Sequence, residues 1–208
     1  MNRRKTYHLD DGKQKSSGFF VCLIFFLCGV FVGIFSARAL DASGAFALRE
    51  NTLSLIESIS EGTHVSPSFF STFWLTGRYH LLASFLGFSI LGMFFLPVLA
   101  GVRGFYLSFS VAALIRAFGP PALPLALSLF GVWAMVSVPT FFFLANQSFD
   151  TAVQLGKSLF GGPKLLFSTL YGRKFLQVTV LSFLAVILLV LLELYFTPIL
   201  VLWTSSFL

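Results

Sequence analysis

The sequence predicts an all-α membrane protein, a polytopic helical bundle with about five transmembrane helices. Of its 208 residues, 57% are hydrophobic and only 11% are charged, whereas a soluble domain carries about 25% charge. The apolar stretches are long and continuous, unlike the alternating strands of a membrane barrel. Each stretch must therefore satisfy its backbone hydrogen bonds within one helix. We expect a single integral membrane domain over residues 1–208, with the lipid bilayer as its solvent.

A basic tail, residues 1–17, precedes the first predicted span, at about residues 18–40. The tail contains Arg3, Arg4, Lys5, Lys13 and Lys15, and no charge follows from Gly18 to Ala37. A cleaved signal peptide is the alternative, because an Ala-rich patch at 37–47 resembles a cleavage site. The uncharged run is longer than the 7–15 apolar residues of a typical signal peptide. We therefore expect an uncleaved first helix.

Residues 41–78 form the predicted outer loop. Its apolar residues are spaced as in a short amphipathic helix: Leu48, Leu55, Ile56 and Ile59. Ser66 and Pro67 are typical of a helix start, with serine as the N-cap and proline at the first helical position. Four aromatic residues follow on one helical face: Phe69, Phe70, Phe73 and Trp74. Aromatic residues beside a span usually lie at the head-group level of the bilayer.

The second and third spans are predicted at about 81–102 and 104–119, with a boundary at Arg103 and a kink at Pro97. Only a short uncharged run separates Arg103 from Arg116, too short to cross a core of about 30 Å. The third span works only if both arginines extend their long side chains to opposite interfaces. Gly119-Pro120-Pro121 then predicts a turn.

The fourth span is predicted at about 125–145 and the fifth at about 175–196, which Pro198 ends. Between them, 146–174 is a predicted cytoplasmic amphipathic loop. Its apolar face contains Phe149, Ala152, Val153, Gly156 and Phe160. Its polar face contains Asp150, Gln154 and Lys157. This pattern is typical of a helix lying on the membrane surface.

The distribution of basic residues predicts the topology. With a cytoplasmic N-terminus, the inner side receives ten Lys and Arg residues: the five of the tail, Arg103, Lys157, Lys164, Arg173 and Lys174. The outer side receives four: Arg38, Arg49, Arg78 and Arg116. This bias follows the positive-inside rule. Five spans in the cell membrane then place the C-terminus outside. The net charge of +6 is explained by these flanks, so we expect no nucleic-acid partner.

The residue clusters that enzymes need are not found in the sequence. It contains no His-Glu-x-x-His zinc motif and no Gly-x-Ser-x-Gly nucleophile elbow. Gly156-Lys157-Ser158 resembles the end of a phosphate-binding loop, but Thr151 stands where that motif needs its first glycine. Cys22 and Cys28 lie in an apolar segment without histidine, which is a poor zinc site. We expect no enzyme, no cofactor and no bound metal.

Small residues repeat at four-residue spacing in two spans, which is typical of close helix packing in lipid. They are Gly29 and Gly33 in the first span and Gly104, Ser108 and Ala112 in the third. Packing within one molecule is the main expectation. A homodimer through Gly29 and Gly33 is the alternative.

Glu193 is the one acid within a predicted span. Its helical position places it near the outer interface, at the depth predicted for Arg38 and Arg116. A hydrated interfacial carboxylate and an ion pair with Arg38 or Arg116 are the two interpretations. A proton or ion relay is disfavoured, because no second intramembrane carboxylate supports it.

Ordered segments along the whole chain resemble the stage II sporulation protein M family of endospore-forming bacteria. They are Cys28-Gly-Val-Phe-Val-Gly-Ile-Phe35, Leu91-Gly-Met-Phe-Phe-Leu-Pro97, Arg103-Gly-Phe-Tyr-Leu-Ser-Phe-Ser-Val111 and Leu192-Glu-Leu-Tyr-Phe-Thr-Pro198. The length and the five-span plan also match. Ser108 stands where the family usually has glycine, a change between two small residues.

The resemblance implies a membrane-embedded scaffold of the sporulation engulfment machinery. Such a protein anchors peptidoglycan-degrading partners, stage II sporulation proteins D and P, and performs no catalysis itself. The alternative is a membrane transport protein or permease subunit, since Pro97 and Pro139 are of the kind that interrupts transporter helices. We expect no charged residue at the middle of the bilayer, and this argues against transport.

Overall fold

A computed structural model describes residues 17–63, 67–160 and 172–205. These residues form helices joined by short turns, without a strand among them, which confirms the predicted all-α bundle. The helices in chain order are α2 (Ser17–Arg38), α3 (Ala42–Ser60), α4 (Phe69–Gly87), α5 (Gly92–Phe118), η1 (Pro120–Ala122), α6 (Leu123–Ala126), η2 (Leu127–Gly131), α7 (Val132–Leu159) and α9 (Arg173–Ser205).

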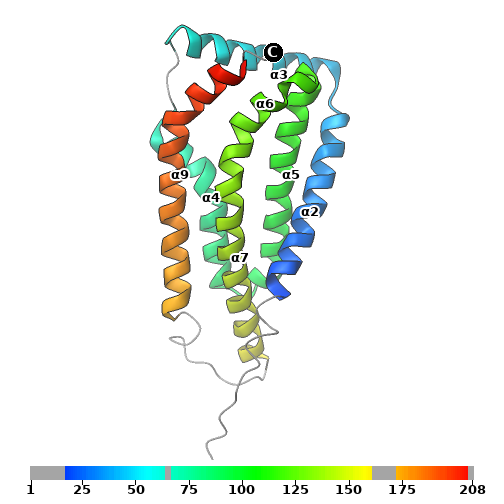
Figure 1. The fold of residues 1–208 in the computed structure, drawn as a ribbon. Coiled ribbons are helices and arrows are strands. Elements are labelled where there is room, and N and C mark those ends of the chain that lie inside the picture. The colour runs from blue at the N-terminus through cyan, green and yellow to red at the C-terminus, as the bar shows by residue number, and fades with distance from the viewer. Residues whose placement is uncertain (1–16, 64–66, 161–171, 206–208) are drawn as a thin grey trace, which may run out of the picture.

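The long helices run side by side, and α3 lies across one end of them (Figure 1). Helix α7 contacts α2, α4, α5 and α9, so it occupies the centre of the bundle. The core between α2, α4, α5 and α7 is built from buried apolar side chains: Cys22, Ala83, Leu96, Ala100, Phe141, Phe142, Leu144, Ala145 and Phe149.

Four stretches are long and apolar enough to cross a membrane: Gly18–Arg38, Gly92–Phe118, Pro120–Leu159 and Phe175–Ser205. The chain is therefore a multi-pass membrane protein. Helix α4 contains Arg78 and His80 and is not among the four, yet it runs beside α7 and α9 within the bundle (Figure 1). The first stretch agrees with the predicted span at 18–40.

The predicted boundary between spans 81–102 and 104–119 is wrong. The chain turns at residues 88–91, and α5 then continues through Arg103 without a break. Pro97 is the sixth residue of α5 and lies inside the helix, where it removes one helical hydrogen bond. Arg103 reaches neither interface, since tertiary contacts hold it inside the bundle.

The amphipathic helix predicted in the outer loop is confirmed as α3. Asp41 caps its start by accepting a hydrogen bond from the Gly44 amide at 3.0 Å. Its inner residues Ile56 and Ile59 pack against a second apolar cluster, formed by Leu114, Leu125, Ala126 and Val201. A second helix, predicted to start at Ser66 and Pro67, is found as α4, which begins two residues later at Phe69 with Ser68 as its N-cap. The predicted extent of the loop to residue 78 is wrong, because α4 continues through that residue to Gly87. Ser66 lies outside the described residues.

The predicted surface helix after residue 146 is also wrong over its described part. The described chain continues from the fourth span as α7 as far as Leu159. Phe149, Ala152 and Gly156 are buried against the bundle, while Phe160 is exposed. The same helical periodicity suits a helix on a membrane surface and one at the edge of a bundle. Residues 161–171 of this prediction lie outside the described residues.

The last helix, α9, runs through Pro198 to Ser205 instead of ending near residue 196. A proline inside a membrane helix removes one hydrogen bond and bends the helix, but neighbouring helices can hold both halves. Here Val201 is fully buried in the cluster below α3. The last part of α9 turns towards α3 (Figure 1).

Candidate functional site

The small residues singled out in the sequence lie between α2 and α5, the most extensive helix contact of the described chain. A Cβ on Gly29 would overlap the carbonyl oxygen of Gly101, and one on Gly104 would overlap that of Phe26. Gly33 faces Ser108 and the Phe105 carbonyl in the same way. Without side chains between them, the two backbones touch, as in other small-residue contacts in lipid.

This contact, the α2–α5 seam, lies within one molecule. Because α5 covers Gly29 and Gly33, those glycines are not available to a second copy of the chain in this structure. Ala112 continues the stripe beyond Ser108 and lines a shallow groove with Arg38 and Arg116.

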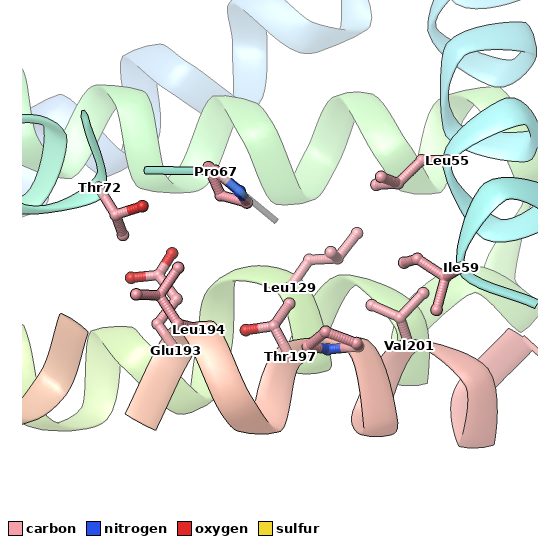
Figure 2. Close-up of a pocket in the computed structure, with 10 residues that line it drawn as sticks. Leu55, Ile59, Pro67, Thr72, Leu129, Glu193, Leu194, Thr197 and Val201 are labelled. Atoms are coloured by element: carbon pink, nitrogen blue, oxygen red, sulfur yellow. The ribbon is translucent and has the colours of Figure 1, made fainter. Parts of the chain in front are cut away.

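The structure does not bring Glu193 to the arginines predicted as its partners. Arg38 lies over the Phe35 ring, 5.6 Å from its centroid, and the Arg116 Nε donates to the Leu40 carbonyl at 3.0 Å. Glu193 instead lies on the inner side of α9, beside Thr72 of α4 (Figure 2). Neither predicted ion pair forms among the described residues.

Arg103 is the central charged residue of the bundle. It is buried, with 7% of its surface exposed. Its guanidinium donates from Nη2 to the Ser137 carbonyl at 3.0 Å and to the Ser137 hydroxyl. It also lies over the rings of Phe141 at 4.6 Å and Tyr79 at 5.4 Å. These cation–π contacts, strongest where water is excluded, come from α4 and α7.

His80 extends this polar region along α4. It is fully buried, and its ring meets Phe141 edge-on at 5.9 Å. Its Nε2 lies 3.5 Å from the Thr140 hydroxyl, a long hydrogen bond. Arg78, one residue before Tyr79, lies over that ring and donates to its hydroxyl at 3.3 Å. Three neighbouring residues of α4 thus place polar groups near Arg103.

Several of these groups lack a partner, which makes the region costly to fold. Arg78 Nε, Arg103 Nη1 and Trp133 Nε1 are buried and have no hydrogen-bond partner among the described residues. An unsatisfied buried donor costs about 1–3 kcal/mol, and an arginine at the centre of a membrane helix costs about 2.5–3.5 kcal/mol. A charge retained at that cost indicates a functional site more often than a structural one.

A cavity of about 300 Å³ adjoins these donors, and we call it the central cavity. Helices α4, α5, α7 and α9 and the short segment η2 form its walls. Its polar lining includes Arg78, Tyr79, Arg103, Ser137 and Glu193, and its apolar lining includes Leu75, Leu107, Phe130 and Leu189.

A second cavity, of about 170 Å³, lies between the central cavity and α3. Figure 2 shows Glu193 and Thr72 at one end of this α3-side cavity and Leu55 and Ile59 of α3 at the other. Leu129 and Glu193 line both cavities. The two cavities therefore extend from the middle of the bundle to α3, and the lining becomes mostly apolar towards α3.

This arrangement is suited to binding a charged ligand. It presents guanidinium, indole, hydroxyl and carboxylate groups to one cavity, which opens at the surface of the bundle beside Leu75 and Tyr106. Among the described residues, no group of three or more His, Cys, Asp or Glu side chains could hold a metal ion.

The sequence interpretation missed this site because it treated every arginine as an interfacial flank. One signal pointed the other way. The uncharged run between Arg103 and Arg116 is too short to cross the bilayer. One longer helix that runs through Arg103 removes this difficulty and places the arginine inside a span.

Comparison with known proteins gave no match: no family model, no curated protein and no solved structure matches this chain. The resemblance to the stage II sporulation protein M family therefore rests on the ordered sequence segments alone.

Proposed function

We propose that this protein is a membrane-embedded scaffold that holds peptidoglycan-degrading partners at the cell membrane during engulfment in sporulation. The observation that carries the proposal is the position of α3, which lies across one end of the bundle (Figure 1). Its inner face is fixed by Ile56 and Ile59, and its outer face is free for a partner. The described chain has little mass outside the bundle in which a catalytic domain could lie.

The outer face of α3 is acidic and exposed. Glu50 and Glu57 share one side of the helix, because seven residues make almost two turns, and Glu61 follows at its end. All three are exposed. Three carboxylates on one side of α3, beside the exposed Phe46 and Leu53, give a partner's basic surface both attraction and register.

The resemblance to the sporulation family supplies the identity of the partners, stage II sporulation proteins D and P. Charge supports the orientation that these partners require. Lys157 and Arg173 lie at the end of the bundle where α2 begins, and the basic tail precedes α2 in the sequence. By the positive-inside rule this end is cytoplasmic. Helix α3 then faces the compartment of the cell wall.

Recovery of partners with the tagged full-length chain tests the proposal. A variant with Glu50, Glu57 and Glu61 all changed to Gln is expected to recover the two partners several-fold less well than wild type, because their electrostatic register is lost. Asn51→Ala, on the exposed side of the same helix, is the matched control and should recover them normally. Deleting the gene in its own host should arrest development at engulfment while vegetative growth stays normal. Normal sporulation of that strain would contradict the proposal.

Thiol labelling in intact cells tests the orientation separately. Single cysteines replace Ser60, in the last turn of α3, and Ser158, near the opposite end of the bundle, in a background without Cys22 and Cys28. An impermeant reagent should label position 60 and not position 158. Labelling of position 158 alone would place α3 in the cytoplasm.

Membrane transport is a second candidate function, and the central cavity around Arg103 is the observation that favours it. An intramembrane charge facing an internal space is typical of substrate pathways. A deletion strain that sporulates normally but fails to take up or export a solute would favour transport over the scaffold.

A further inference from the structure

The central cavity has charges of opposite sign on different walls. Arg78 and Arg103 project from α4 and α5, and Glu193 projects from α9. Glu193 forms no ion pair with either arginine among the described residues. A space that keeps a carboxylate and two guanidinium groups apart is complementary to a ligand that carries both an anionic and a cationic group.

The unpaired donors identify the anionic part of such a ligand. Arg78, Arg103 and Trp133 each line the cavity, and each has one buried nitrogen without a partner in the described chain. A phosphate diester presents two anionic oxygens and two weaker ester oxygens in a tetrahedral arrangement, so donors can approach it from several directions, whereas a carboxylate presents two oxygens in one plane. Arginine is also the residue best suited to bind phosphate. The three nitrogens are covered by neighbouring atoms, so binding requires side-chain rotations, which are common when ligands bind.

The rim of the cavity indicates that the ligand comes from the bilayer. Leu75 and Tyr106 line the cavity and are also 59% and 53% exposed on the outer surface. In a membrane, that surface faces lipid chains. The neighbouring wall is η2, a single π-helical segment that supplies Leu129 and Phe130. Such segments widen a helix locally and frequently occur at functional sites.

We propose that the central cavity binds the head group of a zwitterionic phospholipid that carries a primary amine. Its phosphate is held by Arg78 and Arg103, and its ammonium group faces Glu193. The acyl chains leave the cavity over Leu75 and Tyr106 into the surrounding lipid. This ligand places its single phosphate charge between the two guanidinium groups and its ammonium group opposite Glu193, so each charged wall of the cavity faces a group of opposite sign. The inference is independent of the scaffold role and of the partners proposed for it.

Binding to the full-length protein in a non-ionic detergent, followed by native mass spectrometry, tests this proposal. The probes are phosphatidylethanolamine, phosphatidylglycerol with the same acyl chains, and soluble phosphoethanolamine. Wild type is expected to bind phosphatidylethanolamine more tightly than phosphatidylglycerol. Arg78→Gln and Arg103→Gln should each weaken binding of both lipids about tenfold or more, because charge-assisted hydrogen bonds to phosphate are lost. Arg49→Gln, on exposed α3, is the matched control and should bind as wild type.

Glu193→Gln tests the ammonium site separately from the phosphate site. It should abolish the preference for phosphatidylethanolamine while leaving phosphatidylglycerol bound at least as tightly as in wild type. Equal binding of the two lipids by wild type would overturn the role of Glu193. If Arg78→Gln binds both lipids with wild-type affinity, the phosphate site is overturned. This test does not depend on whether Arg103→Gln folds. Displacement of the lipid by an equal concentration of phosphoethanolamine would show that a free ester, not a lipid, is the ligand.

Discussion

The α2–α5 seam and the interior between α4, α7 and α9 are packed in opposite ways. In the seam, glycines bring two backbones into direct contact, and no charged side chain lies between them. In the interior, helices are separated by aromatic and polar side chains, two cavities and a buried arginine. One half of the bundle is built for close packing. The other half retains space and charge, which is where a ligand can be accommodated.

The largest effect is expected from filling the seam. Gly29→Ala places a methyl group on the Gly101 carbonyl, so α2 and α5 must separate, and overpacking of this kind costs about 1–3 kcal/mol or more. Thermal unfolding in detergent measures the loss. Gly156→Ala is the matched control, because its new Cβ would meet nothing closer than the Ile90 side chain at 3.7 Å, and alanine is the better helix former. Equal stability of the two variants would show that the seam is not tightly packed.

Removing the buried charge from the interior should increase stability, which is the opposite of the effect expected in the seam. Arg103→Met keeps much of the side-chain volume and removes a buried charge with an unpaired donor. We expect the free energy of unfolding to rise by about 1–3 kcal/mol, the usual cost of an unsatisfied buried donor. Arg49→Met on the surface of α3 removes a cation–π contact with Phe118 and should lower stability by no more than about 1 kcal/mol. A large loss of stability in Arg103→Met would mean that Arg103 holds the fold together.

A smaller loss of stability is expected at Ser137, which accepts hydrogen bonds from Arg103 in the interior. Ser137→Ala removes the hydroxyl that accepts from Arg103, and hydrogen bonds inside membrane proteins contribute about 0.6 kcal/mol on average. Ser54→Ala is the matched control, since that exposed hydroxyl bonds only its own helix. A loss of several kcal/mol for Ser137→Ala would make the interior as intolerant of change as the seam.

The smallest effect concerns α3, which contacts both halves through α5 and α9. Hydrogen bonds from the Ser43 hydroxyl and the Gly44 amide hold the pKa of Asp41 below its usual range. A carboxylate of lowered pKa stabilises the folded state above its unfolded pKa, about 3.9, and loses that effect as the pH falls through the folded value.

The hydrogen-exchange protection factors of amides in the first turn of α3 should therefore fall slightly at pH values below about 3.9. Asp41→Asn is the control, because asparagine caps helices as well as aspartate and does not titrate. A variant that shows the same pH response as wild type would place the titrating group elsewhere.

The two halves also differ in how far sequence predicts them. The small-residue stripe containing Gly29 and Gly104 is a local pattern with a local cause, and it lies where the two helices meet. Arg103 is different, because Tyr79, Ser137 and Phe141 come from other helices and only the folded chain brings them to it. Without those contacts in view, an arginine between apolar runs is read as the end of a span. Because of this interpretation, the turn found at residues 88–91 was predicted at Arg103, and the cavity beside Arg103 was not predicted.

The attachment of α3 has a mechanical consequence. Its first residue follows α2 after only three connecting residues, and Arg116 of α5 holds the Leu40 carbonyl in that connection. Its other end leads to α4 through the residues after Ser60 and rests over the α3-side cavity. A force on the first end of α3 acts on α2 and α5, which are closely packed through glycines. A force on its other end acts on the part of the bundle that contains the cavities and deforms more easily. A force applied to α3 by a bound partner would thus tilt α3 about its first end and deform the cavities before it separates α2 from α5.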